Sequence, residues 1–156
     1  MALFLSTYTN KVDKKGRVSV PASFRAAVGG RNFHGIVAFR SYRVPAIEAF
    51  SIDRMERLSA GLDALDLFSD IQDDLAATIF ADSRPLPFDG EGRILLSKEL
   101  AEHAKIGGEA AFVGRGTTFQ IWEPQAFQAH QAQARKRALD RGMTLRLGPT
   151  DAPGGD

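Results

Sequence analysis

The sequence predicts an α+β fold, rich in β-structure, in which two similar halves intertwine as a single domain. The main observation is an internal repeat: residues 13–24 (DKKGRVSVPASF) resemble residues 89–100 (DGEGRILLSKEL). Each half also contains about four short segments of strand-forming residues, with too little apolar surface to fold alone. Finally, a length of 156 residues is typical of one domain.

The repeated segment predicts a tight turn that leads into a strand. Asp13 and Gly16 have the spacing that type I turns favour, and Asp89 and Gly92 repeat it. The apolar positions that follow match in pairs: Val18 with Ile94, Val20 with Leu96, and Phe24 with Leu100. We therefore expect the same turn and strand in both halves.

A short helix is expected after each of these strands. Pro21 is suited to begin a helix over Ala22–Val28, and Ser97 is suited to cap a helix from Lys98 to about Ile106. Two consecutive glycines follow each segment, which favours an end to the helix there.

Longer helices are expected where the halves join and at the end of the chain. An acidic segment over about residues 63–82 has apolar residues at steps of three and four, which predicts a helix. These residues are Leu65, Phe68, Ile71, Leu75 and Ile79. Ser51 is expected to cap a short helix around Ile52–Leu58, and Pro124 to begin a helix that runs to about Arg141.

These elements predict one domain over residues 1–147. Its repeats cover about residues 5–60 and 84–141, and the acidic helix joins them. Residues 148–156 have the composition of a disordered tail.

Composition excludes several classes of function. The chain has no cysteine, so disulfides, thiolate zinc sites and cysteine nucleophiles are absent, which fits a reducing cytoplasm. The three histidines are far apart and form no metal-binding pattern. No apolar run approaches the roughly 20 residues of a membrane span, and the first residues do not resemble a signal peptide. We therefore expect no catalytic site, metal, cofactor or membrane partner.

Charge is distributed unevenly along the chain. Residues 1–43 contain eight Lys or Arg and one Asp, whereas residues 44–82 contain two Arg and nine Asp or Glu. A basic first region is typical of proteins that bind nucleic acids or other anions. Alternatively, the two regions neutralise each other across an intramolecular or subunit interface.

Three segments resemble the MraZ family. They are NKVDKKGRVSVPASFR at residues 10–25, its weaker repeat FDGEGRILLSKELAEHAKI at 88–106, and FVGRGTTFQIWEPQAF at 112–127. The likeness extends over roughly residues 3–141. It departs from the family at Ser97, where proline is usual.

This resemblance implies that both repeats form one swapped-hairpin β-barrel of the AbrB/MazE kind, with flanking helices. It also implies a transcriptional regulator that assembles into a homo-oligomeric ring, an octamer or a dodecamer. Such rings bind short direct repeats of double-stranded DNA in the promoter of the division and cell-wall gene cluster that includes their own gene. The expected location is therefore the cytoplasm, in association with the nucleoid.

The two turns differ in the charges beside their shared residues. Lys14 and Lys15 of the first turn correspond to Gly90 and Glu91 of the second. Shared residues are candidates for a structural role in the turn: Asp13, Gly16, Asp89, Gly92 and Arg93. Basic residues that the second repeat lacks, together with the arginine of the family's Asp-x-x-x-Arg motif, are candidates for DNA binding: Lys11, Lys14, Lys15, Arg17 and Arg25.

Other interpretations stay open at this point. Arg17 is either a DNA-reading residue or a structural partner of Asp13. The chain is either a DNA-binding regulator, an AbrB-like antitoxin, or a ring-forming scaffold that binds a protein through the acidic residues 63–74. An acid/base pair of Asp13 and Asp89 is disfavoured, because aspartate is common at this position of a turn for its backbone hydrogen bond.

Overall fold

The structure, a computed structural model, describes residues 2–30 and 32–150. The chain forms two compact units that divide between Pro124 and Gln125. The first half contains β1 (Thr7–Lys11), β2 (Arg17–Ser19), α1 (Ala22–Val28), β3 (Gly35–Arg40), β4 (Ile47–Phe50) and α2 (Ile52–Asp63). A linking segment contains α3 (Asp70–Leu75) and the π-helical turn η1 (Ala76–Phe80). The second half contains β5 (Arg84–Pro87), β6 (Arg93–Leu95), α4 (Lys98–Ala104), β7 (Glu109–Gly114), β8 (Phe119–Trp122) and α5 (Pro124–Asp140).

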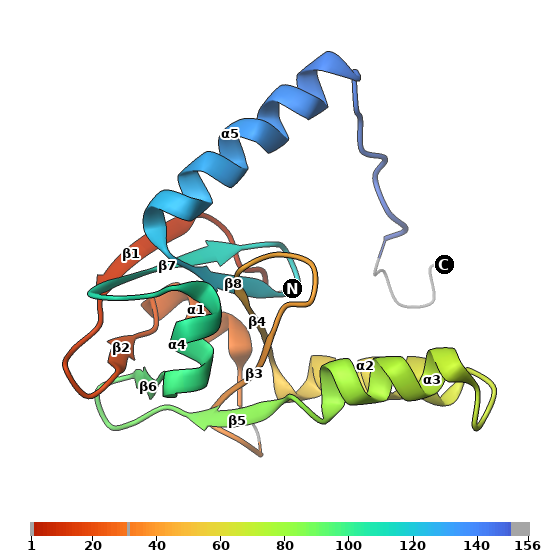
Figure 1. Ribbon diagram of the computed structural model, residues 1–156, viewed down its shortest axis with the longest axis horizontal. Helices are drawn as coiled ribbons and strands as arrows, with labels where there is room; N and C mark the ends of the chain where they lie inside the picture. The colour runs from red at the N-terminus through yellow and green to blue at the C-terminus, as the bar shows by residue number, and fades with distance from the viewer. Residues whose placement is uncertain (1, 31, 151–156) are drawn as a thin grey trace. The chain divides into compact units, whose positions relative to one another are not determined.

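Strands of both halves take part in each of two antiparallel sheets. The larger sheet has the order β1-β7-β8-β4-β3-β5, and the smaller one pairs β2 with β6 (Figure 1). β1 pairs with β7, β5 pairs with β3, and β4 pairs with β8, so each half supplies the partners of the other. The predicted α+β class and the intertwining of the halves are confirmed.

The β2–β6 ladder joins the two repeated segments directly. Arg17 lies opposite Leu95, and Ser19 lies opposite Arg93. At one end the backbone N–H of Leu96 donates to the carbonyl of Gly16 over 2.8 Å. At the other end the N–H of Val20 donates to the carbonyl of Gly92 over 3.0 Å. The two turns therefore leave opposite ends of a ladder only three residues long.

The main core is built from the matched apolar positions of the repeat. All six are buried in one cluster: Val18, Val20, Phe24, Ile94, Leu96 and Leu100. The Phe24 ring also packs against the rings of Phe4 and Phe119, at centroid distances of 5.4 and 5.0 Å. Since the buried residues come from both repeats, neither half has a complete core of its own.

The short helices match the prediction closely, with one difference. α1 has the expected bounds, and the Ser97 hydroxyl accepts a hydrogen bond from the Leu100 N–H, as expected of a cap. However, α4 ends at Ala104 rather than near Ile106, because Lys105 adopts a left-handed conformation with a φ of 55°. A lysine therefore ends this helix before the double glycine is reached.

The predicted continuous helix over residues 63–82 is wrong. α2 begins at the Ser51 cap but continues to Asp63, and residues 64–69 then leave the helical path. A new helix, α3, begins after Ser69, whose hydroxyl caps it. Of the expected apolar face, only Ile79 packs on a core cluster, the one formed by Val37, Phe39 and Met55. Figure 1 shows α2 and α3 side by side, extending to a loop at their far end.

α5 runs from Pro124 to Asp140, and all of it after Pro124 belongs to the second unit. Gly142, with a φ of 56°, follows it close to the expected end. Residues 151–156 of the expected tail lie outside the described residues. In the part of the chain that the structure describes, no helix is long and apolar enough to cross a membrane.

We predict that Gly16→Ala lowers the free energy of unfolding by about 1–3 kcal/mol. Gly16 has a φ of 89°, and a Cβ there would lie 2.7 Å from the carbonyl oxygen of Leu96, within the ladder. Gly90→Ala is the control, because a Cβ at Gly90 meets no atom within 4 Å. Urea unfolding of both variants measures the difference, and equal losses would contradict the role given to Gly16.

Candidate nucleic-acid interface

The first turn joins β1 to β2 and is organised by Asp13. Its carboxylate Oδ1 accepts hydrogen bonds from the backbone N–H groups of Lys15 and Arg17, over 3.0 and 2.8 Å. The N–H of Gly16 donates to the carbonyl of Asp13 over 3.0 Å, which closes the turn. This network holds the backbone between Asp13 and Arg17 in one conformation.

Arg17 pairs with Asp13 inside the same turn. Its Nε lies 2.7 Å from Asp13 Oδ2, and both side chains are more than one third exposed. The arginine is therefore a structural partner of the turn, which was one of the two interpretations of its role. The contact uses one of the five N–H donors of a guanidinium group, so it leaves donor capacity for a second ligand.

The second turn repeats this geometry almost atom for atom. Asp89 Oδ1 accepts from the N–H groups of Glu91 and Arg93, each over 2.9 Å, and Arg93 Nε lies 2.8 Å from Asp89 Oδ2. One difference is chemical: Arg93 Nη1 also lies 3.6 Å from the Glu91 carboxylate. Where the first turn has a lysine, the second has a carboxylate that faces the arginine.

The hydrogen bonds of the turns also stabilise the charged forms of the aspartates. The backbone N–H of Arg17 lowers the pKa of Asp13 most, and the Arg17 side chain lowers it further. The backbone N–H of Arg93 does the same to the pKa of Asp89. Both carboxylates are therefore committed to their turns as anions, which leaves the disfavoured acid/base role without support from the geometry.

The three candidate DNA-binding lysines are all exposed. Lys14 and Lys15 occupy the middle of the first turn, and Lys11 ends β1 just before it, opposite Glu109 of β7. Together with Arg17 they form what we call the basic turn: Lys11, Lys14, Lys15 and Arg17. β1 and β2 pair with β7 and β6, so only the Val12–Val18 bridge and the hydrogen bond from the Asp13 N–H to the Arg17 carbonyl join them at the turn. The exposed cations of this short hairpin have the charge to contact DNA phosphates.

Arg25 lies outside the basic turn. It is half-buried on α1 and donates to the carbonyl of Val20. Its guanidinium also lies over Gly92, where a Cβ would come within 2.7 Å of the Arg25 Cζ. The structure thus places Arg25 against the second turn, away from the basic turn. Its proposed contact with DNA stays a prediction.

Two other arginines form pairs that sequence reasoning did not find. Arg40 Nη2 lies 2.6 Å from Asp82 Oδ1, and this side-chain hydrogen bond lowers the pKa of Asp82. Arg84 donates to the Ser97 hydroxyl over 2.9 Å, so the residue that departs from the family pattern gains a partner. Both pairs join residues that are distant in sequence, and no spacing pattern marks them.

Comparison with known proteins gives a consistent result. A family model described as "MraZ protein, putative antitoxin-like" matches residues 3–42 and 79–146. A protein of Pelagibacter ubique named "Transcriptional regulator MraZ" is 52% identical over 136 residues, which are 87% of this chain and 88% of that relative. Proteins of the same name from Rickettsia akari and Rickettsia bellii are each 44% identical, over 94% of this chain and 98% of theirs.

We predict that Asp13→Asn/Asp89→Asn reduces the acid sensitivity of the fold. Because the folded pKa of each aspartate lies below the unfolded value, its contribution to stability is present above about pH 4 and is lost as the pH falls further. Urea unfolding at pH 7 and pH 3 measures this effect. The variant should lose less stability between the two pH values than the wild-type protein does.

The control is Asp63→Asn/Asp66→Asn, which changes the net charge equally at two exposed positions outside the turns. It should leave the difference between pH 7 and pH 3 close to that of the wild-type protein. If both variants change the acid sensitivity by the same amount, general charge and not the turn geometry governs it.

Proposed function

The chain belongs to the MraZ family, and from this premise we propose that it is a transcriptional regulator that binds double-stranded DNA through the basic turn. Its proposed target is a set of direct repeats in its own promoter, upstream of the division and cell-wall gene cluster. We further propose that it acts in the cytoplasm, in association with the nucleoid, and has no enzymatic role.

The contrast between the two turns is the observation that supports this proposal. Asp13 and Arg17 form the same ion pair as Asp89 and Arg93, at 2.7 and 2.8 Å. A scaffold alone would not require Lys14 and Lys15 in one copy and Gly90 and Glu91 in the other. The added cations therefore point to an anionic ligand at the first turn only.

The lysines and the arginine of the basic turn would have different roles in binding DNA. Lys11, Lys14 and Lys15 supply salt-sensitive attraction to phosphates, which positions the protein without reading sequence. Arg17 can use its remaining N–H donors on the guanine edge in the major groove, the most common specific contact of arginine. Its pairing with Asp13 through Nε would hold the guanidinium in a fixed orientation for that contact.

One such turn is a small contact surface, and we propose that the protein compensates by assembly. A homo-oligomeric ring, an octamer or a dodecamer, carries many identical basic turns. Consecutive direct repeats can then bind several turns at once, and linked contacts raise the overall affinity by orders of magnitude. This arrangement explains why repeated short sites suit a protein with one basic turn per chain.

We predict that Lys14→Ala/Lys15→Ala weakens binding to promoter DNA and makes the binding less dependent on salt. Each lost phosphate contact reduces the slope of log K against log salt by about 1, so two lysines reduce it by about 2. Fluorescence anisotropy over a salt series measures this slope, with scrambled DNA for comparison. Lys98→Ala/Arg115→Ala is the control, because it removes two exposed charges outside the basic turn.

If the turn variant binds as the wild-type protein does, the basic turn is not the DNA-binding surface. In that case the scaffold interpretation, with a protein partner on residues 63–74, gains support.

We also predict that Arg17→Ala and Arg93→Ala have similar effects on stability but different effects on DNA binding. Both remove the same ion pair with an aspartate. If Arg17 reads a base, its loss should reduce the preference for promoter over scrambled DNA by about 10- to 100-fold. Equal preferences in the two variants would show that Arg17 is only structural.

A further inference from the structure

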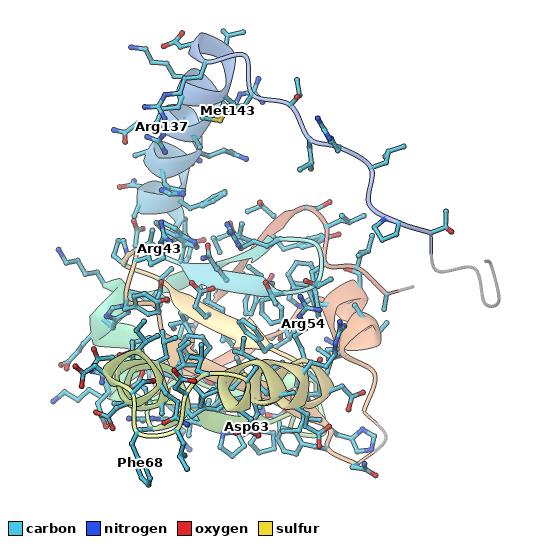
Figure 2. All side chains as sticks on the ribbon, turned by 90° about the vertical axis from the view of Figure 1, so that its right-hand side faces the viewer. Arg43, Arg54, Asp63, Phe68, Arg137 and Met143 are labelled. Carbon is cyan, nitrogen blue, oxygen red and sulfur yellow. The ribbon has the colours of Figure 1, made fainter. Side chains whose placement is uncertain are left out.

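The loop between α2 and α3 carries large apolar side chains that are exposed in the described part of the first unit. Leu67, Phe68 and Ile71 are 70%, 91% and 64% exposed. Figure 2 shows Phe68 at the end of the helix pair, with its ring pointing away from the ribbon. We call residues 63–74 the tip. A group of exposed apolar residues in one place is typical of an interaction surface.

The backbone of the tip holds Phe68 in this outward position. Phe68 has a φ of 68°, which is rare for an aromatic residue and costs conformational energy. The loop around it is ordered: the N–H of Ser69 donates to the carbonyl of Asp66 over 3.1 Å, and the Ser69 hydroxyl caps α3. An unfavourable conformation that exposes a phenyl ring is explained if the ring is buried in a complex.

The negative charge of the tip limits the kind of partner surface that can bind to it. The tip contains five aspartates and no basic residue, and all five are exposed: Asp63, Asp66, Asp70, Asp73 and Asp74. A partner that covers Phe68 must also face these carboxylates. The partner surface is therefore both apolar and basic.

The end of α5 and the residues after it have this combination. Between residues 135 and 146 the chain has five Lys or Arg and one Asp. Exposed apolar residues lie among them, with Leu139 at 82% and Met143 at 53%. A groove of about 760 Å³ is lined there by Ala132, Ala138, Leu139 and Met143, with Arg135 and Lys136 at its side. Figure 2 shows Met143 near Arg137 at this end of the helix.

We propose that the tip of one copy of this chain binds the α5 groove of a second copy. The Phe68 ring enters between Leu139 and Met143, and the aspartates of the tip face Arg135 and Lys136. This inference rests on the proposed assembly and names its subunit contact. Because tip and groove are different surfaces, each copy carries one of each, and repeated contacts close a ring or extend a chain.

The test uses two variants of the full-length protein, one for each surface. Phe68→Asn removes the ring but keeps a residue that tolerates the left-handed conformation. Leu139→Gln/Met143→Gln makes the groove polar, and glutamine suits the helical position of Leu139. Light scattering after gel filtration gives the mass of each, and circular dichroism checks that each is folded. Tyr42→Asn is the control, because Tyr42 is 60% exposed outside both surfaces.

We expect the wild-type protein and the Tyr42 variant to be oligomers, and each surface variant alone to be a monomer. An equal mixture of the two surface variants should form a 1:1 pair and nothing larger, because one intact tip and one intact groove remain. High salt should weaken the wild-type assembly. The proposal is overturned if the wild-type protein is monomeric, if either variant keeps the wild-type mass, or if the mixture stays monomeric.

DNA binding separates this inference from the proposed function. A monomeric Phe68→Asn variant keeps the basic turn, so it should still bind one promoter repeat, while losing at least 10-fold in affinity for consecutive repeats. If the wild-type protein assembles as described but binds no promoter DNA, the proposed function fails and the subunit contact stands. If the variant assembles and binds as the wild-type protein does, the subunit contact fails alone.

Discussion

The ladder between β2 and β6 is the contact on which the rest of the first unit depends. It places Val18 and Ile94 opposite each other in the core, and it uses the carbonyls of Gly16 and Gly92 to accept backbone N–H groups of the other repeat. Each repeat thereby supplies hydrogen-bond partners for backbone groups of the other repeat. Such partners are required because an unpaired backbone group is costly when it is buried. The ladder also sets the position of both turns, because each turn begins where the ladder ends. The basic turn is consequently presented by the most interlocked part of the fold.

Internal repetition shows which parts of the turns serve the fold and which parts are available for the proposed contact with DNA. The aspartate and the arginine of the first turn form a hydrogen bond equivalent to that of the second turn, so both turns have the same framework. At the two positions after each aspartate, the turn uses only backbone groups, so the side chains there can differ between the repeats. Lys14 and Lys15 lie there in the first repeat, and Glu91 lies there in the second, where it faces Arg93. In the proposed function, the lysines contribute to binding alone, whereas Arg17 contributes both to the turn and to DNA contact.

The parts of the structure that local chemistry determines could be predicted from the sequence. Asp-x-x-Gly predicts the turns and Ser97 predicts a helix cap, because each depends on neighbours in the chain. The matched apolar positions of the repeat predict which residues are buried in the core, although they come from both halves. Pairs such as Arg40 with Asp82 could not be predicted, since 42 residues separate them and only the folded sheet brings them together. The end of α4 at Lys105 was missed because glycine, the usual residue in a left-handed conformation, follows two positions later.

The error in the acidic segment is the most informative one. The spacing of apolar residues predicts which face of a helix is suited to burial. It does not show whether the surface that covers this face belongs to the same chain. Ile79 packs on the core formed by Val37, Phe39 and Met55, whereas Phe68 and Ile71, with the same spacing, remain exposed. The exposed part of this pattern is the surface that we propose a second copy covers. The proposed function also favours several linked copies, because one short turn per chain offers few contacts to DNA. An assembly in which the tip of one copy is covered by the next would satisfy both proposals.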